Sequence, residues 1–247
     1  YPMPYQEDLR AKIAAFRGVK QENVFVGVGS DEAIDLLYRI FCQPGKDSVI
    51  INPPTYGMYK VSADINDVDY DEVLLTEGFQ LQPQKILEAV KPNTKMIFVC
   101  SPNNPTANSM ALDDILSVLE GFDGMVIVDE AYIDFSQEHS LTALVDEYSN
   151  LVVLQTMSKS FGLAGIRLGI AIGSPEVISY MMKVKAPYNV NKLTSRKALD
   201  AFSSLDHVSK NIESILDERE RVIQRLITFE EVEYVHPTDA NFVLFKI

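Results

Sequence analysis

Short apolar runs alternate with amphipathic segments along most of this chain, and this pattern constrains the fold more than any other feature. The runs are rich in Val and Ile and lie at 23–27, 48–52, 71–76, 96–100, 125–132, 151–156 and 168–173. Segments with helical spacing lie at 31–41, 83–90, 111–121 and 175–184. Such an alternation predicts a mainly parallel β-sheet covered by helices on both faces, which is an α/β fold.

The pattern changes at about residue 206. A long helix is expected there, with one apolar face formed by Val208, Ile212, Ile215, Leu216, Val222, Ile223 and Leu226. Candidate strands follow at 231–235 and 241–247. We therefore expect a large domain over 1–205, with an N-terminal arm and helix over 1–18, and an incomplete small domain over 206–247. Since the chain begins without a methionine and ends inside a candidate strand, we expect part of the working protein to lie outside it.

Charge and composition exclude several classes of protein. There are 22 Lys and Arg residues against 35 Asp and Glu residues, so a net charge of −13 disfavours general binding to nucleic acid or to an anionic membrane. No apolar stretch approaches the roughly 20 residues of a membrane span, and the first residues are too polar for a secretory signal. Cys42 and Cys100 have neither metal-type nor redox-type spacing, which favours buried free thiols in a reducing compartment. These features predict a cytoplasmic protein.

The residues directly after each apolar run are the candidates for a ligand site, because ligands of open α/β sheets bind beyond the carboxyl ends of the strands. These segments read GVGSDE at 27–32, NPPTYGMY at 52–59, SPNNPT at 101–106, DEAY at 129–132 and TMSKSFGLAGIR at 156–167. Each segment alone has a structural explanation. Ser30 or Asp31 could be a helix N-cap, and Asn103 and Asn104 could form turns. A strand-end Asp is usually a satisfied carboxylate, and a single Lys is usually solvated.

The five segments together resemble the fold type I aminotransferases that use pyridoxal phosphate and, within them, the histidinol-phosphate aminotransferase family. The resemblance covers nearly the whole chain. SK followed by GLAGIR at 158–167 is specific to such enzymes, and PPTYGMY at 53–59 favours this branch over its relatives. The family implies a transaminase that moves an amino group between L-histidinol phosphate and 2-oxoglutarate in histidine biosynthesis. It also implies a homodimer.

The resemblance assigns roles to ten residues. Lys159 would form the Schiff base with the cofactor aldehyde and then transfer a proton between substrate and cofactor. Asp129 would face the pyridine nitrogen and hold it protonated, which makes the ring an electron sink. The remaining assignments are cofactor-ring contacts by Tyr56, Asn104 and Tyr132, and phosphate contacts by Ser30, Asp31, Ser158, Arg167 and, across the dimer, Tyr1. Asp31 would act through its backbone or as a cap rather than through its charge.

Some features depart from the family or stay open. Ala107 stands where the family usually has Gly, at a cost of about 1 kcal/mol if the backbone there needs a positive φ. The family's substrate-binding arginines correspond to a segment after Ile247. His139, His207 and His236 show no ligand spacing, so no metal is expected. Two alternatives stay open: an aminotransferase of the same fold acting on an aromatic or other amino acid, and a catalytically silent protein that binds pyridoxal phosphate or a partner.

Overall fold

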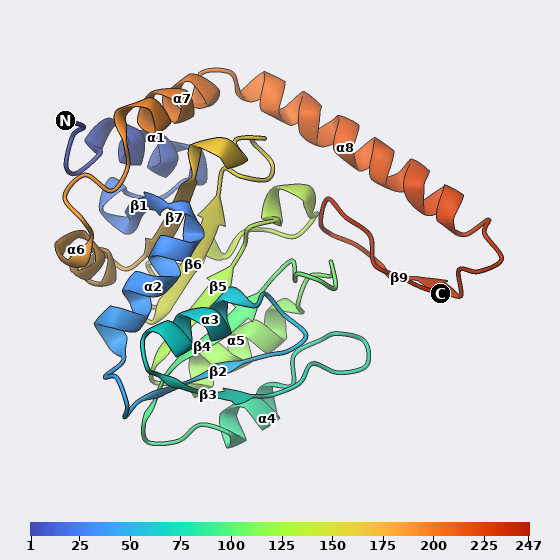
Figure 1. Cartoon of the computed structure of the whole chain (residues 1–247), viewed down its shortest axis with the longest axis horizontal. Helices are drawn as coiled ribbons and strands as arrows, with labels where there is room; N and C mark the ends of the chain where they lie inside the picture. The colour runs from blue at the N-terminus through green and yellow to red at the C-terminus, as the bar shows by residue number, and fades with distance from the viewer.

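A seven-stranded β-sheet forms the centre of the computed structural model, which describes all residues from 1 to 247 (Figure 1). Its strands lie in the order β1-β7-β6-β5-β4-β2-β3. Their bounds are β1 (Val24–Val28), β2 (Ser48–Ile51), β3 (Asp69–Glu72), β4 (Thr94–Cys100), β5 (Met125–Asp129), β6 (Leu151–Thr156) and β7 (Leu168–Gly173). Strands β2 to β6 pair in parallel, whereas β7 runs antiparallel to both β6 and β1. The predicted mainly parallel sheet is confirmed.

Helices cover both faces of the sheet and bury an apolar cluster on each. One face packs against α1 (Glu7–Arg17), α4 (Pro83–Glu88), α5 (Leu112–Gly121) and α7 (Lys192–Phe202). The other face packs against α2 (Gly29–Phe41), α3 (Met58–Ile65) and α6 (Pro175–Val184). Short 3₁₀ helices lie at η1 (Gln21–Asn23), η2 (Ile133–Phe135), η3 (Leu141–Leu144) and η4 (Ala164–Ile166). The central strands are therefore buried on both sides, which explains their continuous apolar sequences.

The alternation of side chains along β5 decides which face each strand-end residue joins. Val126 and Val128 belong to the cluster under α1 and α5, and Ile127 belongs to the cluster under α2 and α3. Because the side-chain period of a strand is two residues, Asp129 continues the α2–α3 face and Glu130 turns to the opposite face. Two successive carboxylates thus enter different environments.

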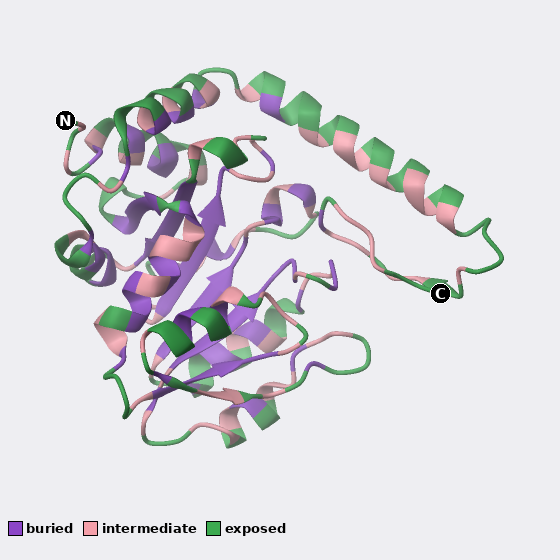
Figure 2. Ribbon diagram, in the orientation of Figure 1, coloured by how far each residue is buried: buried purple, intermediate pink, exposed green.

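The last part of the chain contains the helix α8 (Leu205–Leu226) and a two-stranded antiparallel ribbon of β8 (Tyr234–Val235) and β9 (Phe245–Lys246). The predicted long helix is confirmed, but Val208 is its only buried residue. Figure 2 shows that most of α8 is exposed along its length. Its apolar residues Ile212, Ile215 and Leu216 contact a small cluster formed by Ala107, Tyr132, Phe135 and Ala240. The domain division near residue 205 stays a prediction.

Several predicted boundaries were wrong. The strand expected at 71–76 is β3 at Asp69–Glu72, an edge strand whose length is set by its single partner, the four-residue β2. The strands expected at 231–235 and 241–247 shrink to two residues each because they pair only with one another. Helices α3 and α7 were not predicted, since α3 is short and α7 carries few apolar residues. None of the helices is both long and apolar enough to cross a lipid bilayer.

Candidate active site

A cavity lies at the carboxyl ends of β4, β5 and β6, whose last residues Cys100, Asp129 and Thr156 all line it. A cavity at this edge of an α/β sheet is typical of a small-molecule site. It brings together every predicted site residue except Tyr1, namely Ser30, Asp31, Tyr56, Asn104, Asp129, Tyr132, Ser158, Lys159 and Arg167. Gly29 and Ala131 complete the lining.

Asp129 is the most buried charged group of the cavity, with 3% of its surface exposed. Its Oδ2 accepts a hydrogen bond from the Tyr59 hydroxyl at 2.9 Å, and its Oδ1 accepts one from the Ala131 N–H at 3.0 Å. Burial raises the pKa of this carboxyl to about 6, although both hydrogen bonds oppose that shift. At neutral pH the cavity therefore holds a buried carboxylate whose two close partners are neutral, a setting that favours a cationic ligand group.

Lys159 lies in the turn that follows β6, and its Nζ is 5.1 Å from the centroid of the Tyr132 ring. Tyr132 is buried at the start of η2 and packs edge-on against Phe242 from the C-terminal segment, with ring centroids 5.1 Å apart. The amine, the phenol and the Asp129 carboxylate therefore line one cavity. This placement meets the requirement that an acid and an amine act on the same bound ring.

The start of α2 and the residues around Arg167 form an anion cradle, which we define as Gly29, Ser30, Asp31, Ser158 and Arg167. Strand β1 pairs with β7, so the Gly29 N–H donates to the Arg167 carbonyl at 2.9 Å. The first N–H groups of a helix lack intrahelical partners and attract anions. The Ser158 hydroxyl and the Arg167 guanidinium add donors to this helix start.

Two glycines permit this close packing. Gly29 has φ +75°, and a Cβ there would lie 2.7 Å from Nη2 of Arg167. A Cβ on Gly169 would lie 2.0 Å from the carbonyl carbon of Gly29 and 2.1 Å from the Ser30 nitrogen. Any side chain at 169 would therefore push the β7 backbone away from the cradle.

The expected capping role of Ser30 or Asp31 is wrong. Helix α2 begins at Gly29, its N-cap is Val28, and no side chain caps it. Oδ2 of Asp31 instead lies 3.5 Å from Nη2 of Arg167, and its Oδ1 accepts from the Tyr56 hydroxyl at 3.1 Å. The reason is the turn geometry, because Gly29 takes the first helical position and places Asp31 inside the first turn, opposite Arg167. The predicted contact of the Asp31 backbone with a phosphate stays a prediction.

The amide and aromatic residues divide between ligand and structural positions. Tyr56 and Asn104 line the cavity. Asn103, in contrast, is fully buried, donates to the Pro54 carbonyl and the Thr106 hydroxyl, and accepts from the Thr55 hydroxyl, so it holds two loops together. The concern over Ala107 is justified, since this residue has φ +70°.

Tyr1 lies outside the cavity of its own chain. It is fully exposed, and its ring stacks on Tyr188 with centroids 4.9 Å apart. Its predicted contact with the cofactor of a neighbouring subunit stays a prediction.

Two residues of the cavity wall, and one residue that supports Asp129, were missed from the sequence. Tyr59 is fully buried and donates to Asp129, and Thr156 and Cys100 line the cavity wall. A tyrosine three residues after Tyr56 gave only a weak signal, because the same spacing suits simple helix packing. Burial raises the pKa of the Cys100 thiol to about 12, so this thiol stays protonated and unreactive. Both cysteines are free and buried, as predicted.

The residues present fit pyridoxal phosphate. The anion cradle suits the phosphate, the buried Asp129 carboxylate suits a protonated ring nitrogen, and Lys159 supplies an amine for the aldehyde. The structure contains no cluster of three or more His, Cys, Asp or Glu side chains that could hold a metal ion. Of the three histidines, His236 packs against Phe79 and Tyr234 as an ordinary packing residue.

Comparisons of the sequence and of the structure both find similar proteins. The family model described as aminotransferase class I and II matches residues 1–247. The histidinol-phosphate aminotransferase of Flavobacterium johnsoniae is 51% identical over 247 residues, which are 100% of this chain and 71% of that protein. The crystal structure of the histidinol-phosphate aminotransferase from Clostridium acetobutylicum has a TM-score of 0.90 at 24% identity, covering 99% of this chain and 73% of that one. The Sinorhizobium meliloti enzyme, solved in complex with pyridoxal-5′-phosphate, has a TM-score of 0.90 at 20% identity, covering 98% and 66%.

Proposed function

We infer that this chain, which belongs to the aminotransferase class I and II family and within it to the histidinol-phosphate aminotransferases, transfers an amino group between L-histidinol phosphate and 2-oxoglutarate in histidine biosynthesis. The products are imidazole acetol phosphate and L-glutamate. The observation that carries this proposal is the single cavity that holds an amine, a buried carboxylate and an anion cradle.

Pyridoxal phosphate, when bound, supplies an electron sink that stabilises negative charge at the substrate Cα. The anion cradle would hold its phosphate through the N–H groups of the α2 start, the Ser158 hydroxyl and the Arg167 guanidinium. Asn104 and Tyr132 would hydrogen-bond the phenolic oxygen, and Tyr56 would stack on the ring. These contacts fix the ligand at its two ends and on one face.

The catalytic residues in this proposal are Lys159, Asp129 and Tyr132. The Lys159 amine would hold the cofactor through its aldehyde and would serve as the base that takes up the proton leaving the substrate Cα. Asp129, ionised above about pH 6, would pair with the ring nitrogen and favour its protonated form. Tyr132 keeps its ring beside the Lys159 amine, 5.1 Å from Nζ to the ring centroid, which limits where that amine can move.

Absorbance tests the cofactor site. The purified protein with added pyridoxal phosphate is expected to show the visible band of a lysine-bound cofactor, and Lys159→Ala is expected to lose it. Lys20→Ala is the matched control, because Lys20 is an exposed lysine paired with Asp146 at 3.0 Å. A band that persists in Lys159→Ala would refute the assignment, and Lys20→Ala is expected to keep the band of the wild type.

Substrate choice is tested separately, because the fold alone does not select a substrate. With 2-oxoglutarate as acceptor, kcat/KM for histidinol phosphate is expected to exceed that for phenylalanine by on the order of 10⁴-fold, since a site built for a polar group rejects an analogue that lacks it. Equal values would favour an aromatic amino acid aminotransferase. No turnover with either substrate, together with a normal visible band, would favour a silent binding protein.

A homodimer in the cytoplasm completes the proposal. The fully exposed Tyr1 ring and the neighbouring Tyr188 form an aromatic surface that supports a contact with a second subunit. Light scattering of the purified protein tests this directly, with twice the 27.7 kDa chain mass as the expected result. The two free, buried cysteines support a reducing compartment.

A further inference from the structure

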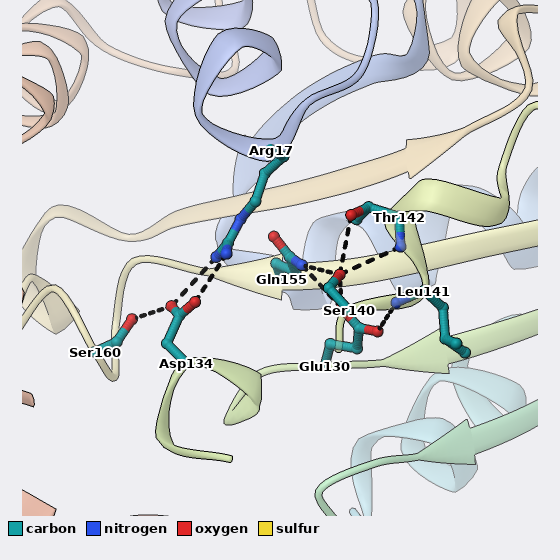
Figure 3. A network of polar contacts seen from close by, with 8 residues as sticks. All are labelled: Arg17, Glu130, Asp134, Ser140, Leu141, Thr142, Gln155 and Ser160. Atoms are coloured by element: carbon teal, nitrogen blue, oxygen red, sulfur yellow. Dashed lines mark hydrogen bonds and ion pairs between the residues drawn. The ribbon is translucent and has the colours of Figure 1, made fainter. Parts of the chain in front are cut away.

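Three polar residues, of which Ser160 is buried and Arg17 and Asp134 are half-buried, join the N-terminal helix to both loops that carry the catalytic groups (Figure 3). Arg17 is the last residue of α1, Asp134 lies in η2 two residues after Tyr132, and Ser160 directly follows Lys159. We propose that Arg17, Asp134 and Ser160 form an ionic brace that positions Lys159 and Tyr132 relative to one another. This proposal rests on the function proposed above.

The Asp134 carboxylate is the junction of the brace. Its Oδ1 accepts from Nη1 of Arg17 at 2.8 Å, and its Oδ2 accepts from Nη2 at 3.2 Å and from the Ser160 hydroxyl. Only 13% of the Arg17 side chain and 17% of the Asp134 side chain are exposed, and Ser160 is buried. A two-pronged arginine–carboxylate pair fixes orientation as well as distance.

Apolar contacts reinforce the same junction. Phe16 precedes Arg17 on α1 and meets Phe161, which follows Ser160, with ring centroids 5.8 Å apart. Phe202 of α7 lies against both rings at 5.5 Å and 5.3 Å. The last turn of α1 therefore holds the lysine turn by a hydrogen-bonded and an aromatic contact on successive residues.

The arrangement favours a positioning role over a purely stabilising one. A buried ion pair often adds little stability compared with apolar residues of the same volume, so stability alone gives a weak reason for it. The junction, however, joins parts of the chain that are distant in sequence. Arg17 of α1 is 117 residues from Asp134, and Ser160 of the lysine turn is 26 residues from it. Those loops carry Tyr132 and Lys159, whose side chains meet at 5.1 Å. A change in the brace therefore alters the geometry of the reacting amine.

The test compares Ser160→Ala, Arg17→Met, Arg17→Lys and the control Arg10→Met. Arg10 also lies on α1, but it donates to the carbonyls of Val24 and Gln21 and so joins the helix to β1 instead of to the loops. Two readouts are needed for each variant: competitive acetylation of Lys159 measured by mass spectrometry without cofactor, and kcat and KM with the visible band of the loaded protein. Ser160→Ala removes only a hydroxyl, so the proposal stays testable if Arg17→Met fails to fold.

Under the proposal, Ser160→Ala and Arg17→Met acetylate faster at Lys159 relative to Lys20, because the lysine turn loses its anchor. They also lower kcat by on the order of 10²-fold while KM changes little, as expected when a reacting group is misplaced. Arg17→Lys recovers part of kcat, and Arg10→Met lowers only the unfolding temperature. The proposal is overturned if Ser160→Ala and Arg17→Met behave like Arg10→Met in both readouts. If the wild-type protein lacks a Lys159-dependent band, the proposed function fails, and the acetylation rates still decide whether the brace positions the amine.

Discussion

Asp129 and Glu130 are adjacent carboxylates, 3% and 2% exposed, yet they occupy opposite faces of the sheet and unlike surroundings. Asp129 lines the cavity and accepts from one hydroxyl and one N–H. Glu130 is enclosed: it accepts from the Ser140 hydroxyl at 2.5 Å, the Leu141 N–H at 2.7 Å and the Gln155 amide at 2.9 Å (Figure 3). Burial is the main reason that the pKa of each carboxyl is raised.

The contrast teaches that burial alone does not identify a catalytic carboxylate. Both carboxylate oxygens of Glu130 accept hydrogen bonds from protein donors, so its charge stabilises the fold. Asp129 lines the cavity that Lys159 and Arg167 also line, so its negative charge acts on a ligand that binds there. Three protein groups donate to Glu130 and two to Asp129, and only Asp129 shares its cavity with Lys159 and Arg167; these two features separate the roles.

The largest expected difference between the two carboxylates is in turnover. Asp129→Asn keeps the shape but removes the charge opposite the ring nitrogen, which is worth roughly 4 kcal/mol at about 4 Å and an effective dielectric near 20. We expect kcat to fall by on the order of 10³-fold. Glu130→Gln, assayed in parallel after equal cofactor loading, is expected to stay within about tenfold of wild type. Equal losses in the two variants would break the comparison.

The second difference is in the pH dependence of stability without cofactor. The folded pKa of Asp129, about 6, lies above its ordinary value of 3.8, so between these values the folded protein retains a proton that the unfolded chain has released. Stability therefore falls as the pH rises from 3.8 to about 6, by about 3 kcal/mol at roughly 1.4 kcal/mol per unit.

The Asp129→Asn variant cannot ionise at this position and should escape this loss. Urea unfolding on both sides of this pH range should show the variant to be more stable than wild type only at the higher pH. A difference between the two proteins that does not change with pH would contradict the assignment of a raised pKa.

The third difference concerns Glu130 and the fold. Glu130→Gln places an amide N–H₂ among three donors, so at least one buried donor loses its acceptor. We expect the free energy of unfolding to fall by about 1–3 kcal/mol at neutral pH, as measured by urea denaturation. A variant as stable as wild type would show that the enclosed network is dispensable.

The smallest expected effect concerns the hydrogen bond from Tyr59 to Asp129. Tyr59→Phe removes a buried hydroxyl that lowers the pKa of Asp129, so the pKa of that carboxyl should rise further. A hydrogen bond to a charged group contributes about 1.5–3 kcal/mol. We expect kcat/KM to fall by about tenfold near neutral pH and its acidic limb to move to higher pH. An unchanged pH profile would mean that Tyr59 only packs against Phe98, with ring centroids 4.8 Å apart.

The fold was predictable where the chain is buried on both sides. Strands β4 to β7 have continuous apolar sequences because helices cover both faces of the sheet, and helices α2, α5 and α6 have amphipathic patterns because one face of each packs on it. The predicted bounds of the edge strand β3 and of the ribbon of β8 and β9 were wrong. These strands are exposed or half-buried, so their side chains need not be apolar. The antiparallel direction of β7 could not be predicted either, because its sequence has the same apolar pattern as the parallel strands.

The residues that line the site were predictable from their sequence motifs, whereas the residues that hold them in position were not. Residues such as Lys159 and Arg167 lie eight positions apart in one distinctive segment. Arg17 and Asp134 are separated by 117 residues, and nothing local selects that pair among 22 cations and 35 acids. The N-cap role expected for Asp31 was wrong for the same reason, since its contact with Arg167 depends on the pairing of β1 with β7.

The pairing of β1 with β7 sets the order in which the anion cradle can form during synthesis. Its helix start comes from residues 29–31, and its cation comes from residue 167, which reaches the edge of the sheet only as the partner of β1. A nascent chain on the ribosome can therefore form α2 long before it can retain a phosphate there. Cofactor capture is in this sense a late event in biogenesis, one that follows assembly of the sheet from its first strand to its last.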